Sequence, residues 1–179
     1  FIIEDFILQQ GYSSDTDSFS IAGKLKFVSF NNQWFDQQAV NPYTPAAYSW
    51  PSSMAIEKQE ELKKEIQRLL RLLNMKTAIY NIETRVGIDG NAYIMELSPR
   101  GGGNRLAECI HYATGVDMIT NMVKYSVGLP MDEITQKGYD GYWAEIILHS
   151  DEEGNFHELW ISDEIVPNVI EKDIWISEG

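Results

Sequence analysis

Residues 78–100 read AIYNIETRVGIDGNAYIMELSPR, and this stretch decides the fold prediction. Two runs rich in Ile, Tyr and Val flank Asp89 and Gly90, a dipeptide favoured in tight hairpin turns because both central residues need positive φ. If these two residues form the loop, Glu83 and Glu96 face each other across the hairpin. Directly opposed side chains lie about 4.5–5.5 Å apart, and like charges there are destabilising. A divalent cation held between the two carboxylates is the simplest reason for such a pair.

The length of the loop decides whether this pairing holds. The two-residue loop also makes two further pairs, Ile88 with Asn91 and Val86 with Tyr93. A loop of three to five residues instead offsets the two glutamates and leaves them as solvated edge charges. The spacing alone leaves both registers open.

A glycine-rich segment, Ser98-Pro-Arg-Gly-Gly-Gly-Asn104, follows the second run. Its glycines expose backbone N–H groups, and a helix expected from about Asn104 adds a favourable potential for an anion. Arg100 adds a permanent charge and a planar donor fork at the same place. A triple glycine alone is more often a flexible loop. Together with two carboxylates for a hard cation, however, this set is what a metal–phosphate complex requires.

The composition describes a globular protein with a core, because 44% of its 179 residues are hydrophobic and 12% are aromatic. This length holds one domain, or a domain with a small appended unit. The net charge of −13 argues against binding nucleic acid or an anionic membrane through a broad basic surface. No segment approaches the roughly 20 apolar residues of a membrane span. The single cysteine, Cys109, excludes an internal disulfide framework and suits a cytoplasmic location.

Periodicity and turn residues predict the remaining elements. The clearest is a helix over residues 54–74, where Leu62, Ile66, Leu70 and Leu73 recur on one stripe. The other expected elements are a strand over 1–8, a loop over 11–18, a strand pair over 19–30, an irregular connection over 31–53, helices ending near 114 and spanning 117–127, and strands over 142–149, 156–161 and 165–170. The sequence begins without Met and inside an expected strand, so we expect a piece of a longer protein.

The hairpin and its flanks resemble the ATP-grasp superfamily, which includes biotin carboxylase, carbamoyl-phosphate synthetase and amino-acid ligases. The family pattern is a Glu on one strand and Glu-x-Asn-x-Arg on the next. Residues 3–7, IEDFI, resemble the hinge strand of that family, and the GVD and GLP stretches at 115–117 and 128–130 resemble its following helix. The resemblance implies an α+β fold over 1–130, the carboxy-terminal part of an ATP-grasp domain with an antiparallel sheet flanked by helices. A small β-rich extension over 131–179 would follow it.

The resemblance also implies the site residues. Glu83 and Glu96 would hold Mg²⁺, with Mn²⁺ as an alternative, against the phosphates of ATP, and Arg100 would be catalytic by steadying the transferred phosphoryl group. The hinge would bind the nucleotide through backbone groups at the adenine and an acidic side chain at the ribose, with Glu4, Asp5, Phe6 and Ile7 as its residues. Ser98 stands where the pattern has Asn, so its role as a metal ligand is open. So is the choice between Asp15 and Asp17 as a further ribose-binding acid.

The implied function is part of an ATP- and Mg²⁺-dependent ligase. Such enzymes convert a carboxylate to an acyl phosphate, which an amine or another nucleophile then attacks. The expected partners are therefore a small-molecule carboxylate and nucleophile, together with the amino-terminal and lid domains that the family has and these residues lack. We expect the isolated chain to be inactive. The alternatives are a degenerate module that binds nucleotide or a partner without catalysis, and a plain α+β binding domain whose glutamates have no role.

Overall fold

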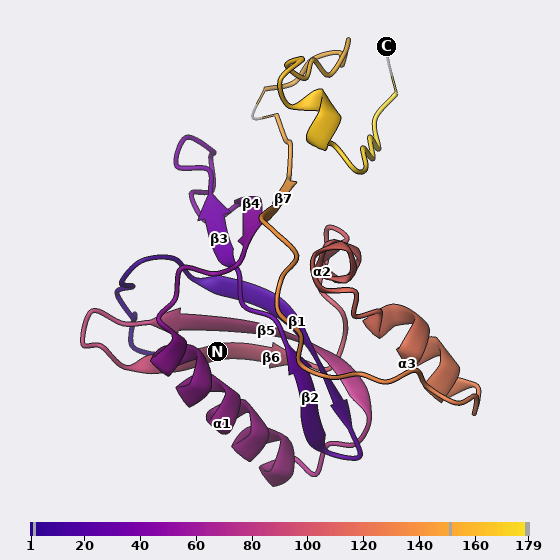
Figure 1. Cartoon of the computed structure of the whole chain (residues 1–179). Coiled ribbons are helices and arrows are strands. Elements are labelled where there is room, and N and C mark those ends of the chain that lie inside the picture. The colour runs from indigo at the N-terminus through magenta and orange to yellow at the C-terminus, as the bar shows by residue number, and fades with distance from the viewer. Residues whose placement is uncertain (2, 151, 178–179) are drawn as a thin grey trace. The chain divides into compact units, whose positions relative to one another are not determined.

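Two antiparallel sheets and three α-helices form the described part of Phe1–Leu148, the first of two units in the structure (Figure 1). The computed structural model describes residues 1, 3–150 and 152–177. The second unit is His149–Gly179, and its described residues contain one short 3₁₀ helix, η1, at Val166–Asn168. The expected α+β class, with antiparallel sheets flanked by helices, is confirmed.

The larger sheet has four strands in the order β2-β1-β5-β6, and the smaller has three in the order β3-β4-β7. The strands of the larger sheet are β1 (Ser14–Ile21), β2 (Lys24–Val28), β5 (Ala78–Val86) and β6 (Ala92–Ser98). Those of the smaller sheet are β3 (Asn32–Phe35), β4 (Pro45–Trp50) and β7 (Trp143–Ile146).

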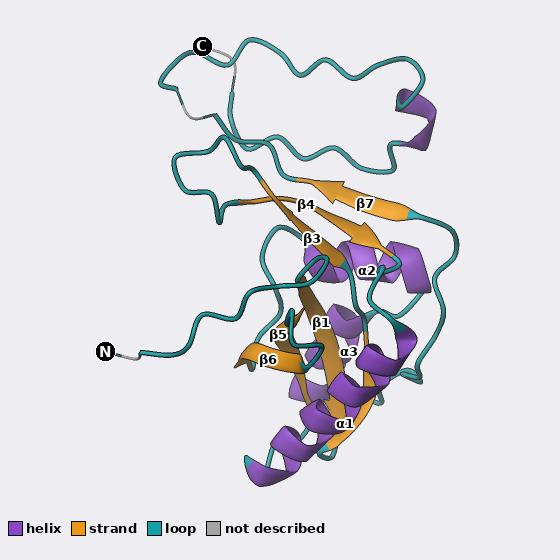
Figure 2. Ribbon diagram, turned by 90° about the vertical axis from the view of Figure 1, so that its left-hand side faces the viewer, coloured by secondary structure: helices purple, strands orange, loops and turns teal. Residues whose placement is uncertain are grey.

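Helix α1 (Ile56–Leu72) packs on one face of the larger sheet, as Figure 2 shows. Leu62, Ile66 and Leu70 form its buried stripe and contact the buried Tyr80 and Ile82 of β5. Burying one such aliphatic side chain stabilises the fold by about 1.5–3 kcal/mol. The helix predicted over 54–74 is therefore confirmed, and its charged residues lie on the solvent side.

Two shorter helices, α2 (Leu106–Thr114) and α3 (Met118–Ser126), pack in a second core on the other face. This core joins Phe19 of β1 to Ile110 and Met118 of the helices and to Tyr48 and Trp50 of β4. The same face of the larger sheet is polar at its other end, where β1 carries acidic residues. The candidate functional site lies there.

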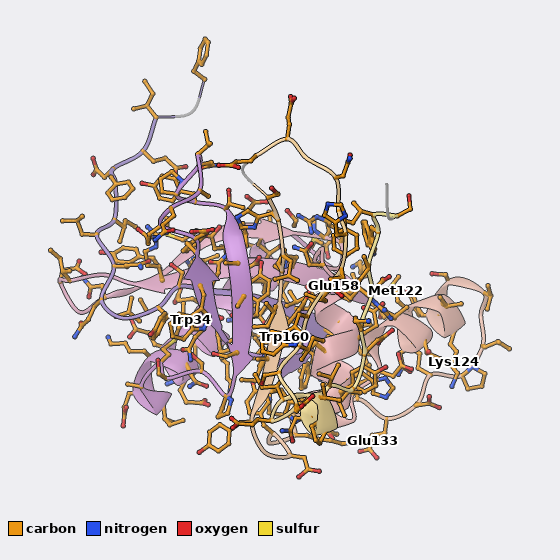
Figure 3. All side chains as sticks on the ribbon, turned by 90° about the horizontal axis from the view of Figure 1, so that it is seen from above. Trp34, Met122, Lys124, Glu133, Glu158 and Trp160 are labelled. Atoms are coloured by element: carbon orange, nitrogen blue, oxygen red, sulfur yellow. The ribbon has the colours of Figure 1, made fainter. Side chains whose placement is uncertain are left out.

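The ends of α2 and α3 follow the sequence prediction. Gly115 ends α2 with a left-handed φ of 71°, which glycine adopts without steric cost. Asp117 caps α3 by accepting a hydrogen bond from the Thr120 backbone N–H at 2.8 Å. Lys124 of α3, labelled in Figure 3, pairs with Asp132 at 2.7 Å and holds the segment that follows the helix.

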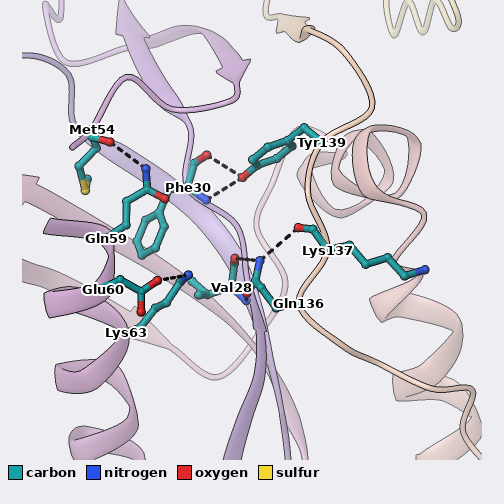
Figure 4. A network of polar contacts seen from close by, with 9 residues as sticks. All are labelled: Val28, Phe30, Met54, Gln59, Glu60, Lys63, Gln136, Lys137 and Tyr139. Atoms are coloured by element: carbon teal, nitrogen blue, oxygen red, sulfur yellow. Dashed lines mark hydrogen bonds and ion pairs between the residues drawn. The ribbon is translucent and has the colours of Figure 1, made fainter. Parts of the chain in front are cut away.

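Side chains from residues 131–148 cover the open edge of β2 (Figure 4). The Gln136 amide accepts from the Val28 N–H at 3.1 Å and donates to the Val28 carbonyl at 3.0 Å. The Tyr139 hydroxyl does the same for Phe30, at 3.1 and 2.9 Å. These bonds satisfy backbone groups that an edge strand leaves unpaired. Residues up to 148 thus belong to the first unit, while the domain boundary near residue 130 stays a prediction.

Several expected elements differ from the structure. β1 begins at Ser14, inside the expected loop over 11–18, and β3 and β4 lie inside the expected irregular connection over 31–53. Residue 2 lies outside the described residues, and the rest of the segment over 1–8 forms no strand. The strands expected over 156–161 and 165–170 are also absent from the described part. In the second of them, Pro167 lies within η1 and lacks the N–H that a ladder needs. None of the described helices is long and apolar enough to span a bilayer.

Candidate functional site

The hairpin between β5 and β6 places Glu83 and Glu96 opposite each other, as predicted. Of the two loop lengths that the sequence left open, the longer one is formed, yet it does not offset the glutamates. Gly87 donates its N–H to the Asn91 carbonyl at 2.9 Å, which makes a three-residue loop over 88–90 with Gly90 at a φ of 77°.

A bulge in β6 corrects the register. Val86 pairs with Ala92 instead of Tyr93, but Met95 is an extra residue between the partners of Glu83 and Thr84. The extra loop residue and the bulge shift the register in opposite directions, so they cancel at the glutamates. The bulge therefore sets the pairing of Glu83 with Glu96 and of the two pairs beyond it, Ile82 with Leu97 and Asn81 with Ser98.

A third carboxylate lies in the same row. Asp15 of β1 pairs with Glu83 on the side opposite Glu96, so Asp15, Glu83 and Glu96 cross three adjacent strands on one face. Asp15 is held there by the Tyr48 hydroxyl at 3.0 Å and by the Asn81 amide at 2.8 Å. The sequence analysis considered Asp15 only as a ribose ligand on a loop. Residues 15–18 are all polar, so the local sequence pattern gives no signal of a strand there.

The row concentrates negative charge. Burial, the Asp15 carboxylate and the Glu96 carboxylate raise the pKa of Glu83, while Arg85 opposes the shift with its guanidinium at 3.7 Å. Glu96 is exposed and accepts a hydrogen bond from the Ser98 hydroxyl at 2.7 Å. A cation placed between these carboxylates would relieve their mutual repulsion.

A second row lies two residues further along the same strands and joins the sheet to the glycine-rich loop. Asp17 pairs with Asn81, and Asn81 pairs with Ser98. The buried Asp17 carboxylate accepts the Gly102 N–H through both oxygens, at 2.9 and 3.1 Å. The Gly102 N–H, which we expected to face a ligand, is therefore committed to a side chain of the protein.

The loop also changes where α2 begins. Asn104 and Arg105 have left-handed φ values of 52° and 60°, so the helix starts at Leu106, two residues later than expected. Arg100 lies in the part of the loop next to β6, where its N–H donates to the Ser98 carbonyl and its guanidinium donates to the Gly101 carbonyl at 2.9 Å. Arg100 is exposed. Its positive charge lowers the pKa of Asp17, so it acts on the acidic rows.

The Asp17 carboxyl titrates near neutral pH. Burial raises its pKa to about 7, more than the Gly102 and Asn81 hydrogen bonds lower it. Glu145 of β7, which pairs with Tyr48, also has a raised pKa. Burial is the larger cause and the Glu108 carboxylate the next, and together they raise the pKa to about 8. Its Oε2 atom is buried without a hydrogen-bond partner, which favours the protonated form. Sequence reasoning missed Glu145, because only the pairing of β4 with β7 brings it near the site.

The raised pKa of Asp17 predicts a pH-dependent stability. Between pH 4 and 7 the unfolded chain loses the Asp17 proton while the folded chain keeps it, so the free energy of unfolding falls as pH rises, by up to about 4 kcal/mol. Asp17→Asn should remove this part of the slope. Urea unfolding at pH 5 and pH 8 measures it, with Glu61→Gln on α1 as the control. An unchanged slope in Asp17→Asn would contradict the assignment.

Of the predicted hinge residues, Ile7 contacts the end of β5. Ile7 is half-buried, and its carbonyl accepts a hydrogen bond from the Arg85 guanidinium at 3.0 Å. Glu4, Asp5 and Phe6 are exposed. Their proposed contacts with a nucleotide stay predictions. Arg85 thus contacts both the Ile7 carbonyl and the Glu83 carboxylate.

The donor set fits a hard cation that shares its ligands with phosphate. Within residues 1, 3–150 and 152–177, no three His, Cys, Asp or Glu side chains are arranged to hold a metal ion by themselves. Mg²⁺ does not need such a cage, because it binds through one or two carboxylates, phosphate oxygens and waters. Glu83 and Glu96, which pair with each other across β5 and β6, meet that description.

Comparison with solved structures identifies the fold. The phosphoribosylglycinamide synthetase of Anaerococcus prevotii matches with a TM-score of 0.72 and 16% identity, over 94% of this chain and 43% of that chain. The L-amino acid ligase of Bacillus licheniformis matches with a TM-score of 0.74 and 19% identity, over 97% and 44%. The biotin carboxylase domain of the Hydrogenobacter thermophilus 2-oxoglutarate carboxylase, in complex with MgADP, ADP and bicarbonate, matches with a TM-score of 0.55 and 14% identity, over 74% and 29%.

The chain therefore has the ATP-grasp fold, and the resemblance seen in the hairpin is confirmed at the level of fold. It spans less than half the length of these structures. No family model matches the sequence, and no curated protein matches it significantly.

Proposed function

We propose that the chain is the metal-binding part of an ATP- and Mg²⁺-dependent ligase that activates a carboxylate as an acyl phosphate for attack by an amine or another nucleophile. The observation that carries the proposal is the opposed pair of Glu83 and Glu96, flanked by Asp15 and followed by Arg100. The fold supports it, because the similar structures are a synthetase, a ligase and a carboxylase, the last of them bound to MgADP.

Each group has a distinct task in this proposal. Glu83 and Glu96 hold Mg²⁺, which when bound neutralises negative charge on the phosphates of ATP. Arg100 offers a permanent cation and several N–H donors to the phosphoryl group in transfer. The hinge residues 4–7 contact the adenosine. The acceptor carboxylate, the nucleophile and the amino-terminal and lid domains of the full-length protein complete the reaction.

A non-catalytic nucleotide-binding module is the second candidate. It is favoured by Ser98, which stands in place of the family's Asn and donates its hydroxyl to Glu96. A site that lacks the third oxygen ligand can retain Mg²⁺–nucleotide without turning it over. The two candidates differ in turnover and not in binding.

ADP release by the full-length protein separates these candidates. We expect ADP release with Mg²⁺ and ATP only when the correct amino acid or small carboxylate from a panel is present. The signal should disappear in Glu83→Gln and persist in Glu60→Gln, whose carboxylate pairs with Lys63 on the exposed side of α1. Nucleotide binding with no ADP release across the panel would favour the non-catalytic module.

A further inference from the structure

Arg85 contacts both ends of the proposed nucleotide site. Its Nη1 donates to the Ile7 carbonyl at 3.0 Å, and its Nε donates to the Ser13 hydroxyl at 3.1 Å. Its Nη2 lies 3.7 Å from Glu83 Oε1. With 11% of its side chain exposed, Arg85 is far more buried than a surface ion-pair partner.

The backbone explains why one residue can reach both ends. Arg85 follows Glu83 by two positions on β5, so the two side chains lie on the same face. The amino-terminal segment crosses the end of the strand at this point, where the Leu8 carbonyl accepts from the Ile88 N–H at 2.9 Å and Gln10 donates to the Val86 carbonyl at 2.8 Å.

We propose that Arg85 is a positioning residue that couples the hinge segment to the metal-binding carboxylate Glu83. The inference deepens the proposed function, because it assumes that the hinge binds adenosine and that Glu83 binds the metal. Arg85 touches neither ligand in this scheme. Its guanidinium fixes the Ile7 carbonyl and, through the same rigid plane, the Glu83 carboxylate.

The chemistry of arginine suits this role. A guanidinium presents five donors in a fixed plane, so it can bond three acceptors in different directions at once. A lysine ammonium keeps the charge but replaces the planar fork with a single flexible point. Lysine can therefore compensate the Glu83 charge without holding the Ile7 carbonyl. Glutamine loses the charge and most of the donors.

Two probes that each report one end of the site test the coupling in the full-length protein. Adenosine probes the hinge, and Mg²⁺ with inorganic tripolyphosphate probes the carboxylates, with dissociation constants measured by titration calorimetry. Arg85→Gln should weaken the binding of both probes by about tenfold or more, since it removes a charge-assisted hydrogen bond to the Ile7 carbonyl and the ion pair with Glu83. Arg85→Lys should recover much of the tripolyphosphate affinity and leave adenosine binding weak.

Two further variants separate the inference from the proposed function. Glu83→Gln should weaken only the Mg²⁺–tripolyphosphate complex, and Lys58→Gln on α1, which removes a cation paired with Glu61, should change neither dissociation constant. If Arg85→Gln and Arg85→Lys weaken only one probe, or neither, the coupling is wrong. If Glu83→Gln leaves Mg²⁺–tripolyphosphate binding intact, the metal assignment is wrong, and the loss of adenosine binding in the Arg85 variants then reports on the hinge alone.

Discussion

Glu96→Gln is expected to lower Mg²⁺-dependent turnover of the full-length protein by at least ~100-fold, because it removes one of two carboxylates that hold the metal against the phosphates. The same change should leave folding intact. Glu96 is exposed, glutamine has nearly the same shape, and the loss of one negative charge relieves repulsion within the row of Asp15, Glu83 and Glu96.

Two measurements are needed for this variant: the rate of substrate-dependent ADP release and the thermal midpoint of unfolding. We expect the first to collapse and the second to stay the same or rise. Glu60→Gln, which removes a carboxylate paired with Lys63 on the exposed side of α1, is the control for both. Turnover in Glu96→Gln within a few fold of the unmodified protein would contradict the assignment of Glu96 to the metal.

Gly102→Ala is expected to destabilise the fold by about 1–3 kcal/mol, the usual cost of overpacking. A Cβ at this position would lie 2.7 Å from Leu106 Cδ2, 2.9 Å from Asn81 Nδ2 and 3.1 Å from Asp17 Oδ1. The Asn81 amide cannot easily move away, since it also holds Asp15 at 2.8 Å. The loop that carries Arg100 must then lift from the sheet, so turnover should fall as well.

The next residue offers a matched control. A Cβ at Gly103 would meet no atom within 4 Å, so Gly103→Ala should have little effect on stability. Urea unfolding of the two variants at one pH compares them directly. Equal stability of Gly102→Ala and Gly103→Ala would show that the loop is not packed on Asp17.

The parts of the fold with local signals were predicted from the sequence. The apolar stripe of α1 recurs at helical spacing from Leu62 to Leu70, and the Asp117 cap and Gly115 terminator mark the short helices. These signals depend on neighbours in the chain, so a single sequence is enough to find them.

Strand β1 was missed at its start because its polar residues read as a loop. Ser14, Thr16 and Ser18 are nevertheless fully buried and pair with residues of β5. The Ser14 hydroxyl donates to the distant Asn31 side chain at 3.1 Å. Such long-range pairing has no signature in the local pattern.

The candidate site was predicted in part, and for a partly wrong reason. Glu83 does face Glu96, but through a three-residue loop and a bulge at Met95 instead of the tight turn. The contribution of Asp15 and the capture of the Gly102 N–H by Asp17 depend on how β1 pairs with β5. Neither follows from spacing within the hairpin, because each needs a strand more than 60 residues away.

The position of the bound metal is the most direct test of the central claim. Substoichiometric Mn²⁺ with ATP, added to the full-length protein, broadens the amide resonances of residues near the ion. We predict that the signals of Asp15, Glu83 and Glu96 broaden first, while Ile21, roughly 20 Å from Asp15 along β1, keeps its line width. Broadening centred on any other part of the sheet, or spread evenly over the chain, would contradict a metal–nucleotide site on this acidic row.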